Sequence, residues 1–228
     1  MKRKQQRTNK RNTPQPGVVE MYKRNGKRIL DILFSAVASV VLIPLFLLMS
    51  LWIRLDSPGP AIFRQKRVGK DKVLFDIYKF RTMRLNAPRD VATHELKNAK
   101  QYITASGRFM RKTSIDELPQ LWNIFLGQMS FIGPRPALWN QKDLIAYRDQ
   151  YQANSVLPGL SGWAQVNGRD ELSLEKKALR DGQYAQNISF WLDLKCFILT
   201  VVKVFNREGI AEGKEGKHYA TRQLEEKE

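Results

Sequence analysis

An uncharged, strongly apolar run over residues 32–53 constrains the fold of this chain more than any other feature. The run reads ILFSAVASVVLIPLFLLMSLWI, about the length that a helix needs to cross the hydrocarbon core of a bilayer. A cleaved signal peptide has a shorter apolar core and a small-residue cleavage site, whereas here Arg54, Pro58 and Pro60 follow. We therefore expect the segment to be retained and to lie in or on a membrane.

The residues that flank this run are basic on both sides. Lys27 and Arg28 precede it and Arg54 and Arg64 follow it, so the positive-inside rule places both ends on the cytoplasmic face. Pro44 lies near the centre and removes one helical hydrogen bond, which favours a kink. Two interpretations remain open at this point: a re-entrant helix that bends at Pro44 and returns, and a single span with a basic far side.

The net charge of +17 at pH 7 indicates a polyanionic partner. Nucleic acid, anionic lipid headgroups and phosphorylated substrates all satisfy the charge, but nucleic-acid binding leaves the apolar run unexplained. The first 26 residues are basic and nearly free of apolar side chains until residue 18, and we expect a disordered tail held near anionic lipids. Cys196 is the single cysteine, and His94 and His218 lie far apart, so neither an internal disulfide nor a cysteine or histidine metal site is expected.

Beyond the apolar run, the pattern predicts a mostly helical α+β domain with one β-hairpin. Residues 61–83 alternate apolar and polar side chains around a Gly-Lys-Asp turn, which is typical of two antiparallel strands. The Pro and Gly content of GPRP (133–136) and LPGLSG (157–162) predicts loops. The predicted helices cover residues 93–102, 106–113, 118–126, 139–153, 174–186 and 190–205, and charges within the last of these favour core or interfacial packing over a second span.

Two adjacent carboxylates, Asp116 and Glu117, stand in the stretch TSIDELPQ. Ser114 and Glu117 fit a capping box, in which both side chains satisfy amides at the start of a helix. Pro119 argues against this simplest form, because it has no amide hydrogen and prefers the first helical position. The alternative is an ionised pair at a helix entrance, favoured by the helix dipole and by nearby cations such as Arg111, and able to act as a nucleophile or to bind a divalent cation. Spacing alone leaves both open.

Four motifs together resemble the bacterial sugar transferases, which are monotopic polyprenyl-phosphate phosphoglycosyl transferases. They are KRILDILFSAV (27–37), KFRTM (79–83), RKTSIDELPQLWNIFLGQMSFIGPRP (111–136) and PGLSGWAQVNGRDEL (158–172), and the similarity covers about residues 27–209. The resemblance implies transfer of a phospho-sugar from a UDP-sugar to a polyprenyl phosphate, with release of UMP, as the start of glycan assembly. It also implies a re-entrant membrane helix kinked at a proline, which is Pro44 here.

The resemblance assigns roles to the carboxylates. Asp116 matches the family's nucleophile, which attacks the β-phosphorus and forms a covalent aspartyl phospho-sugar that the polyprenyl phosphate then takes up. Glu117, together with Asp116, is implied to hold the Mg²⁺ that neutralises the diphosphate.

The resemblance also implies substrate contacts. Arg135, which two prolines hold in a stiff loop suited to binding phosphoryl oxygens, matches the family's phosphate-binding arginine. The full set of implied contacts is Arg111, Arg135, Asn167, Arg169, Lys79 and Arg81. Gln128 stands where the family commonly has an aspartate, and residues 153–157 lack a basic residue that the family often has there. The stretch RDELSLEKKALRDGQYA resembles the subgroup that handles N-acetylated amino sugars.

The expected organisation is a basic disordered tail (1–26), a membrane-embedded re-entrant helix (27–56), a small cytosolic catalytic domain with a short β-hairpin (57–209) and a C-terminal tail (210–228). We expect the domain on the cytoplasmic face of the bacterial inner membrane, with a UDP-sugar, a polyprenyl phosphate and anionic lipids as partners, and no nucleic acid. A homo-oligomer stays open. The rival enzymatic interpretation is a conventional membrane-associated glycosyl transferase, which moves only the sugar and releases UDP. A purely structural membrane anchor needs neither GPRP nor the carboxylate pair.

Overall fold

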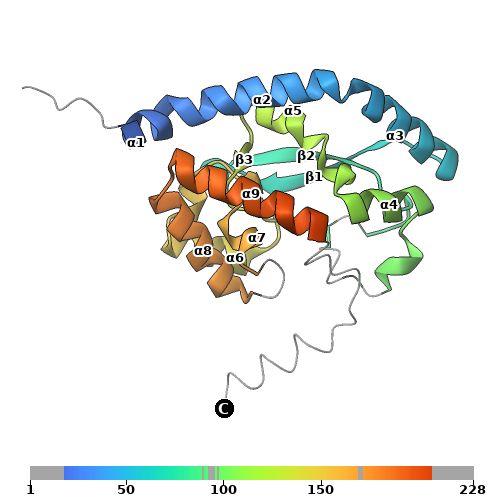
Figure 1. Cartoon of the computed structure of the whole chain (residues 1–228). Helices are drawn as coiled ribbons and strands as arrows, with labels where there is room; N and C mark the ends of the chain where they lie inside the picture. Colours follow the sequence, from blue (N-terminus) through green and yellow to red (C-terminus); the bar gives the residue numbers. More distant parts are fainter. Residues whose placement is uncertain (1–17, 89, 92–95, 97, 169–171, 207–228) are drawn as a thin grey trace, which may run out of the picture.

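The computed structural model describes residues 18–88, 90–91, 96, 98–168 and 172–206, which form helices packed around two small sheets (Figure 1). The first 17 residues of the predicted tail and the whole of the segment 210–228 lie outside the described residues. Residues 18–26 correct the prediction of a disordered tail, because they form a short helix, α1 (Val18–Met21), and a π-helical turn, η1 (Tyr22–Gly26). The Tyr22 hydroxyl donates to the Asp193 carboxylate and its ring packs edge-on against Phe190, which holds this turn in place.

A bent pair of helices, α2 (Lys27–Val41) and α3 (Ile43–Asp56), runs across the top of the molecule in Figure 1. The two helices are bent by 61°, and the break between them falls at Leu42. Among the described residues no single helix is both long and apolar enough to cross a membrane, whereas this bent pair meets that test together. Pro44 is the second residue of α3 and has no amide hydrogen to give to the carbonyl of Val40.

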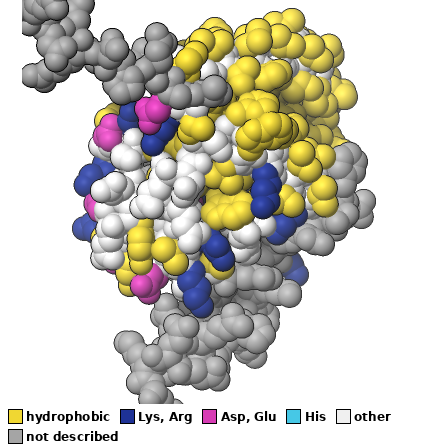
Figure 2. All heavy atoms as spheres, turned by 60° about the vertical axis from the view of Figure 1, so that its left-hand side comes forward, with side chains coloured by type: hydrophobic (Ala, Val, Ile, Leu, Met, Phe, Trp, Pro, Cys, Tyr) yellow, Lys and Arg dark blue, Asp and Glu magenta, His cyan; other side chains and the backbone are white. Residues whose placement is uncertain are grey.

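The outward face of the bent pair is apolar. Figure 2 shows hydrophobic side chains gathered at the top of the molecule, where α2 and α3 lie in Figure 1. The exposed large apolar residues of the pair are Ile29, Ile32, Leu33, Phe34, Val37, Val40, Val41, Ile43, Leu47, Leu48, Leu51, Trp52 and Leu55. A continuous apolar surface of this kind is typical of a site that contacts a membrane or another protein.

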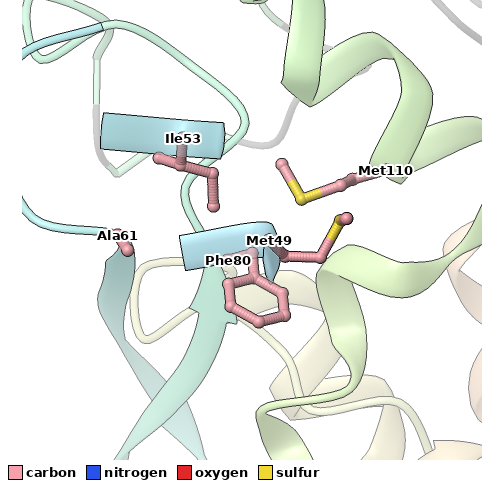
Figure 3. Close-up of a cluster of buried hydrophobic side chains, with 5 residues drawn as sticks. All are labelled: Met49, Ile53, Ala61, Phe80 and Met110. Carbon is pink, nitrogen blue, oxygen red and sulfur yellow. The ribbon is translucent and has the colours of Figure 1, made fainter. Parts of the chain in front are cut away.

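The inner face of α3 packs on the rest of the chain. Met49 and Ile53 of α3 meet Ala61, Phe80 and Met110 in a buried hydrophobic cluster (Figure 3). This cluster joins the bent pair to the hairpin and to α4 (Ala105–Thr113), which is the helix that leads into the carboxylate pair.

The predicted hairpin is confirmed. Strands β1 (Ile62–Val68) and β2 (Leu74–Phe80) are antiparallel, in a register that pairs Ile62 with Phe80 and Val68 with Leu74. A second sheet consists of the parallel strands β3 (Ser130–Ile132) and β4 (Gly159–Ser161). Strand β4 corrects the prediction that residues 157–162 form only a loop. Gly159 permits the pairing because its backbone approaches Gly133 so closely that a Cβ there would lie 2.1 Å from the Gly133 nitrogen.

Most of the predicted helices are present, although two of them, α5 (Gln120–Phe125) and α6 (Lys142–Gln150), are shorter than predicted. The others are α4, α8 (Leu174–Gln186) and α9 (Phe190–Asn206), and a short helix α7 (Trp163–Val166) was not predicted. Helix α6 is shorter than predicted because Gln152 takes a left-handed conformation just beyond its end. The predicted helix over 93–102 falls partly outside the described residues, and its described part holds only a 3₁₀ turn, η3 (Ala99–Gln101).

Helix α5 packs on the hairpin through a second buried cluster. Leu121 and Ile124 of α5 contact Phe75 and Ile77 of β2. Cys196 lies fully buried in a third cluster on α9, as its apolar surroundings in the sequence predicted.

Candidate active site

The two carboxylates lie in a 3₁₀ turn, η4 (Ile115–Glu117), between α4 and α5. Ser114 takes a left-handed conformation with φ of 57° and its side chain makes no capping hydrogen bond, so the capping box does not form. Pro119 stands immediately ahead of α5, with a φ of −61° that suits the entrance of a helix. The interpretation that places the carboxylates just before a helix is therefore confirmed as regards their position.

Glu117 pairs with two cations that reach it from different elements. The Lys79 ammonium on β2 lies 2.8 Å from Oε1, and the Arg135 guanidinium donates to both carboxylate oxygens. Burial alone would raise the pKa of Glu117, but Arg135 and Lys79 outweigh it and hold that pKa well below its usual range. Glu117 is therefore ionised at neutral pH.

Asp116 has different surroundings, although it is the adjacent residue. Within the part of the chain that the structure describes, its carboxylate accepts no hydrogen bond. Burial and the negative charge of Glu117 raise the pKa of Asp116, against the opposing charges of Lys79, Arg111 and Arg135. The pKa values of the two adjacent carboxyls therefore move in opposite directions. A carboxylate that lacks hydrogen bonds and has a raised pKa is the more basic and more nucleophilic member of the pair.

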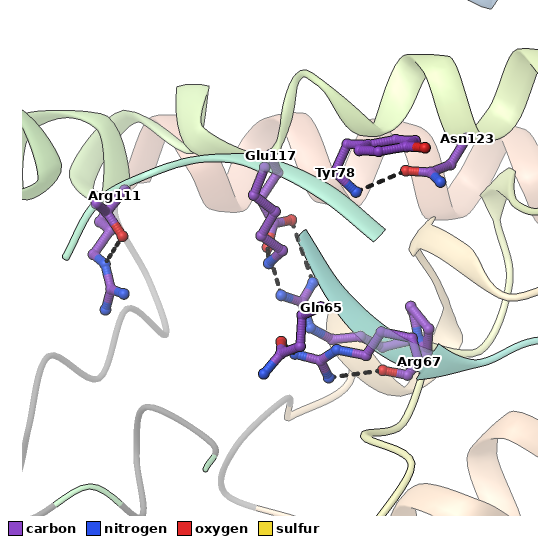
Figure 4. Close-up of polar contacts among 10 residues, drawn as sticks. Gln65, Arg67, Tyr78, Arg111, Glu117 and Asn123 are labelled. Carbon is purple, nitrogen blue, oxygen red and sulfur yellow. Dashed lines mark hydrogen bonds and ion pairs between the residues drawn. The ribbon is translucent and has the colours of Figure 1, made fainter. Parts of the chain in front are cut away.

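Further cations surround the pair (Figure 4). Figure 4 shows Glu117 pointing from its turn toward the strand that carries Gln65 and Arg67. Arg67 contributes to this surplus of positive charge, and burial together with the nearby charge of Arg135 lowers the pKa of Arg67 to about 10. The sequence reasoning missed Arg67 as part of the site, because a basic strand next to a membrane segment also suits lipid headgroups.

The other predicted contacts divide into those that the fold brings to the pair and those that it does not. Arg111 lies near the pair, since its charge acts on Asp116 and its Nε donates to the Thr82 hydroxyl at 2.8 Å. Arg81 is buried away from the pair, and its guanidinium donates to the carbonyls of Ser57 and Pro58 just beyond the end of α3.

The QVNGR motif contributes less to the described site. Asn167 donates to the carbonyl of Trp163, which closes the short helix α7. Arg169 lies outside the described residues. The structure brings together five of the predicted site residues: Lys79, Arg111, Asp116, Glu117 and Arg135.

Gln128 has a local structural partner. Its side-chain oxygen accepts from the Asn123 amide at 2.7 Å, and the same amide donates to the carbonyl of Asp76. Asn123 also accepts from the Tyr78 amide, so this residue fixes α5 to β2 next to the carboxylate pair. A carboxamide at position 128 suits this contact because its oxygen receives the donated hydrogen without adding charge.

The carboxylate pair partly fits a divalent cation. Mg²⁺ is usually bound through one or two carboxylates together with substrate phosphates, and two adjacent carboxylates meet that requirement. Among the described residues no group of three or more His, Cys, Asp or Glu side chains is placed to hold a metal. Glu117 already pairs with two cations, so Asp116 is the more available ligand of the two.

Comparison with known proteins extends these observations. The family model described as "Bacterial sugar transferase" matches residues 22–207. The UDP-glucose:undecaprenyl-phosphate glucose-1-phosphate transferase of Escherichia coli K12 is 36% identical over 206 residues, which cover 85% of this chain and 42% of that protein. The uncharacterized sugar transferase EpsL of Bacillus subtilis is 42% identical over 186 residues, covering 80% of this chain and 90% of EpsL. The UDP-N-acetylgalactosamine-undecaprenyl-phosphate N-acetylgalactosaminephosphotransferase of Aeromonas hydrophila is 38% identical over 183 residues, covering 77% of this chain and 42% of that protein. The chain thus spans about two fifths of the length of the Escherichia coli and Aeromonas hydrophila relatives.

Proposed function

The chain belongs to the bacterial sugar transferase family, and from this premise we propose that it transfers a phospho-sugar from a UDP-sugar to a polyprenyl phosphate and releases UMP. The observation that carries the proposal is the contrast within the carboxylate pair. Glu117 forms ion pairs with Lys79 and Arg135. The Asp116 carboxylate accepts no hydrogen bond from the described residues, although the charges of the same two cations act on it. One carboxylate thus organises the cations, and the other is available for covalent chemistry.

The proposed reaction has two steps at Asp116. In the first, a carboxylate oxygen attacks the β-phosphorus of the UDP-sugar, the bond from that phosphorus to the bridging oxygen breaks, and UMP leaves with the bonding electrons. In the second, an oxygen of the polyprenyl phosphate attacks the same phosphorus and the acyl-phosphate bond breaks. The second step forms the polyprenyl diphosphate sugar and restores the Asp116 carboxylate.

The cations support both steps. Lys79, Arg135, Arg111 and Arg67 carry four positive charges against the two negative charges of Glu117 and the ionised Asp116, and the surplus attracts the diphosphate. Fixed cations of this kind stabilise the charge that develops on the phosphoryl oxygens without reorganisation during the reaction. The positive charge of Arg111 also opposes the rise in the pKa of Asp116.

Mg²⁺ is part of the proposal, with Asp116 and Glu117 as the residues that would hold it. When bound, the cation would neutralise the diphosphate and stabilise the leaving UMP. Removal of divalent cations with EDTA is expected to abolish release of UMP, and added Mg²⁺ is expected to restore it. Full turnover in EDTA would contradict the requirement for the metal.

We propose that the bent pair of α2 and α3 is a re-entrant segment in the cytoplasmic leaflet of the bacterial inner membrane. The 61° bend, the position of Pro44 two residues after the break, and the exposed apolar face support this placement. The basic residues on both flanks are then available to anionic lipid headgroups. Labelling of cysteines introduced on either side of Pro44 in intact cells tests the geometry. The re-entrant proposal fails if a cysteine at Gly17 reacts with a membrane-impermeant reagent from outside the cell.

The sugar is proposed only as a class. Two of the three relatives named above have UDP-glucose or UDP-N-acetylgalactosamine in their names, and the segment after NGR supports an N-acetylated amino sugar for this chain. A panel of UDP-sugars that includes UDP-glucose, UDP-galactose and their N-acetylated amino counterparts decides the donor.

Intact-protein mass spectrometry tests the covalent step. The detergent-solubilised protein is incubated with Mg²⁺ and each UDP-sugar, without lipid acceptor, and the released nucleotide is identified by chromatography. We expect a mass increase of one phospho-sugar and release of UMP for the wild type, and neither for Asp116→Asn. Asp143→Asn, an equivalent change of an exposed carboxylate on α6, is the matched control and is expected to behave as the wild type.

Two results would contradict the proposal in different ways. Release of UDP would indicate a conventional glycosyl transferase. Turnover to UMP with polyprenyl phosphate, but no covalent adduct in its absence, would indicate direct transfer between the two substrates and would give Asp116 another role.

A further inference from the structure

In the loop that carries Arg135, the carbonyl groups of four consecutive residues, 134–137, each accept a hydrogen bond from another part of the chain. Residues 134 and 136 are prolines and donate no hydrogen bonds, so the loop depends on its carbonyl oxygens for anchorage. The donors to these carbonyls are Gly159 N to Pro134, Arg148 Nη2 to Arg135, Arg67 Nη1 to Pro136 and Val68 N to Ala137, at distances of 2.9, 2.9, 3.0 and 2.9 Å. Two of the four donors are arginine side chains, and they hold the carbonyls of Arg135 itself and of the next residue.

Arg148 is an unusual donor because it is buried as an ion pair. Its side chain on α6 is 6% exposed and that of its partner Asp181 on α8 is 1% exposed. Arg148 donates to Asp181 through Nε at 2.9 Å and through Nη2 at 2.6 Å, and Nη2 also donates to the Arg135 carbonyl. A buried ion pair gives little net stability compared with apolar residues of the same size. Its presence behind the loop therefore points to a role other than stabilising the packing of α6 against α8.

Arg67 holds the other side of the loop from β1. Its Nη2 donates to the side-chain oxygen of Gln65 at 2.7 Å, which orients the guanidinium so that Nη1 reaches the Pro136 carbonyl. The guanidinium of Arg135 itself donates to both carboxylate oxygens of Glu117.

We propose that Arg148 and Arg67 are positioning residues for Arg135. Resting on the proposed function, this inference assigns to Arg148 and Arg67 the task of fixing the backbone of the loop, so that the Arg135 guanidinium stays on the β-phosphate during transfer. This positioning role acts through the loop backbone, and it is separate from the positive charge that Arg67 adds around the carboxylate pair. Displacement of a catalytic group by about 1 Å can reduce a rate by about 100-fold, so the supports of Arg135 are expected to matter for rate more than for substrate affinity.

Arg148→Lys is the first variant for testing this inference. Lysine keeps the positive charge beside Asp181 but has one point charge in place of the planar fork, so it cannot hold both Asp181 and the Arg135 carbonyl in the same way. The second variant, Arg148→Gln with Asp181→Asn, removes both charges together and leaves no buried ion unpaired. Arg67→Lys tests the other support.

The readouts are kcat and KM for release of UMP with polyprenyl phosphate present, in the wild-type and in the Arg135→Ala background. We expect each positioning variant to lose about 10- to 100-fold in kcat with KM changed less than about threefold. In the Arg135→Ala background the same changes are expected to cost less than about twofold, because the group that they position is absent. Ile188→Val, a mild change in a buried cluster that leaves the donors to the loop in place, is the control for lost stability.

A substrate-free readout accompanies the kinetics. Phenylglyoxal modifies accessible guanidinium groups, and the side chain of Arg135 is 37% exposed. Peptide mapping by mass spectrometry is expected to show faster modification of Arg135 in Arg148→Lys than in the wild type, since the loop no longer holds that guanidinium against Glu117.

The outcomes separate this inference from the proposed function. Wild-type kcat and an unchanged rate of Arg135 modification in Arg148→Lys would overturn the inference. An equal loss of kcat in the Arg135→Ala background would also overturn it, because the effect would then run through the fold as a whole. If the wild type releases no UMP from any UDP-sugar, the proposed function fails, and the rate of Arg135 modification still decides whether Arg148 positions that residue.

Discussion

Neutralising the two adjacent carboxylates one at a time is expected to change stability in opposite directions. Glu117→Gln removes the anion that pairs with Lys79 and Arg135, and these two cations then lack their counter-ion in a largely buried site. Asp116→Asn removes a charge that burial and the neighbouring Glu117 disfavour. Glu117→Gln should therefore destabilise the protein, and Asp116→Asn should stabilise it while abolishing transfer.

The magnitude follows from the exposure of the partners. The side chains of Lys79 and Glu117 are 15% and 17% exposed, and removing one member of a buried ion pair costs about 3–5 kcal/mol. The Arg135 side chain is 37% exposed, so solvent screens its pair, which adds about 0–1 kcal/mol. Each kcal/mol shifts the Tm of a chain of this size by about 2–4 °C, which predicts a Tm lower by about 6–24 °C for Glu117→Gln. Asp116→Asn is expected to raise the free energy of unfolding by about 0.5–2 kcal/mol.

The pH dependence provides an independent check of the sign. The pKa of Glu117 is lowered in the folded state, so its contribution is present above the pKa of the unfolded chain and is lost as the pH falls through the folded value. The pKa of Asp116 is raised in the folded state, so the destabilisation that its charge causes is complete above the folded-state pKa and disappears below the pKa of the unfolded chain. The gain in Tm of Asp116→Asn over the wild type is therefore expected to shrink on acidification from about pH 7 to about pH 4.

Thermal unfolding of the detergent-solubilised protein, followed by far-UV circular dichroism, measures these differences. The double variant Glu117→Gln with Lys79→Gln removes an anion and a cation together and is expected to recover part of the lost Tm. The exposed control Asp143→Asn should stay within about 0.5 kcal/mol of the wild type. A Tm that moves in the same direction for both single variants would refute the assignment of different electrostatic roles to the pair.

Three further predictions concern residues around the site. Arg81→Met is expected to destabilise the protein by about 2–4 kcal/mol, since the carbonyls of Ser57 and Pro58 beyond α3 lose a charged donor. The control Arg64→Met, at an exposed position, should cost less than about 0.5 kcal/mol, and equal Tm values for the two variants would contradict the role of Arg81 at the end of α3. Arg111→Met is expected to move the acid limb of the pH profile of kcat/KM to higher pH, because the reaction needs ionised Asp116 and the charge of Arg111 opposes the rise in the pKa of that carboxyl. An acid limb at unchanged pH would show that Arg111 does not influence the ionisation of Asp116. Asn123→Ala is expected to cost about 2–4 kcal/mol, because the Tyr78 amide loses its acceptor at a buried position; a Tm equal to that of the wild type would contradict this.

Much of the fold is predictable from short stretches of sequence. The alternation of apolar and polar residues predicts the hairpin, and the helical periodicity of residues 174–186 predicts α8 with its observed bounds. Strand β4 was missed because a three-residue strand flanked by Pro and Gly has no periodicity to detect, and its pairing depends on the close approach of Gly133. The helical residues 18–26 were missed because their partners, Phe190 and Asp193, lie far along the chain.

The candidate site shows the same division. Adjacency in the sequence places Asp116 and Glu117 together, and Pro119 places them ahead of a helix. Adjacency does not reveal that their pKa values move in opposite directions, since that depends on which carboxylate faces Lys79 and Arg135.

The sequence by itself determined the apolar segment, the hairpin, the main helices and the position of the carboxylate pair, because each of these depends on residues that are neighbours along the chain. The tertiary structure alone decided which cations serve the pair and which serve the fold. Lys79 meets Glu117 across 38 positions, whereas Arg81, two residues further on, is buried against the end of α3. The chain carries 39 Lys and Arg residues against 22 Asp and Glu, so composition offers each carboxylate many candidate partners. The choice among them is made by packing, because ion pairing requires contact at about 3–4 Å and only the folded chain fixes such distances between remote residues.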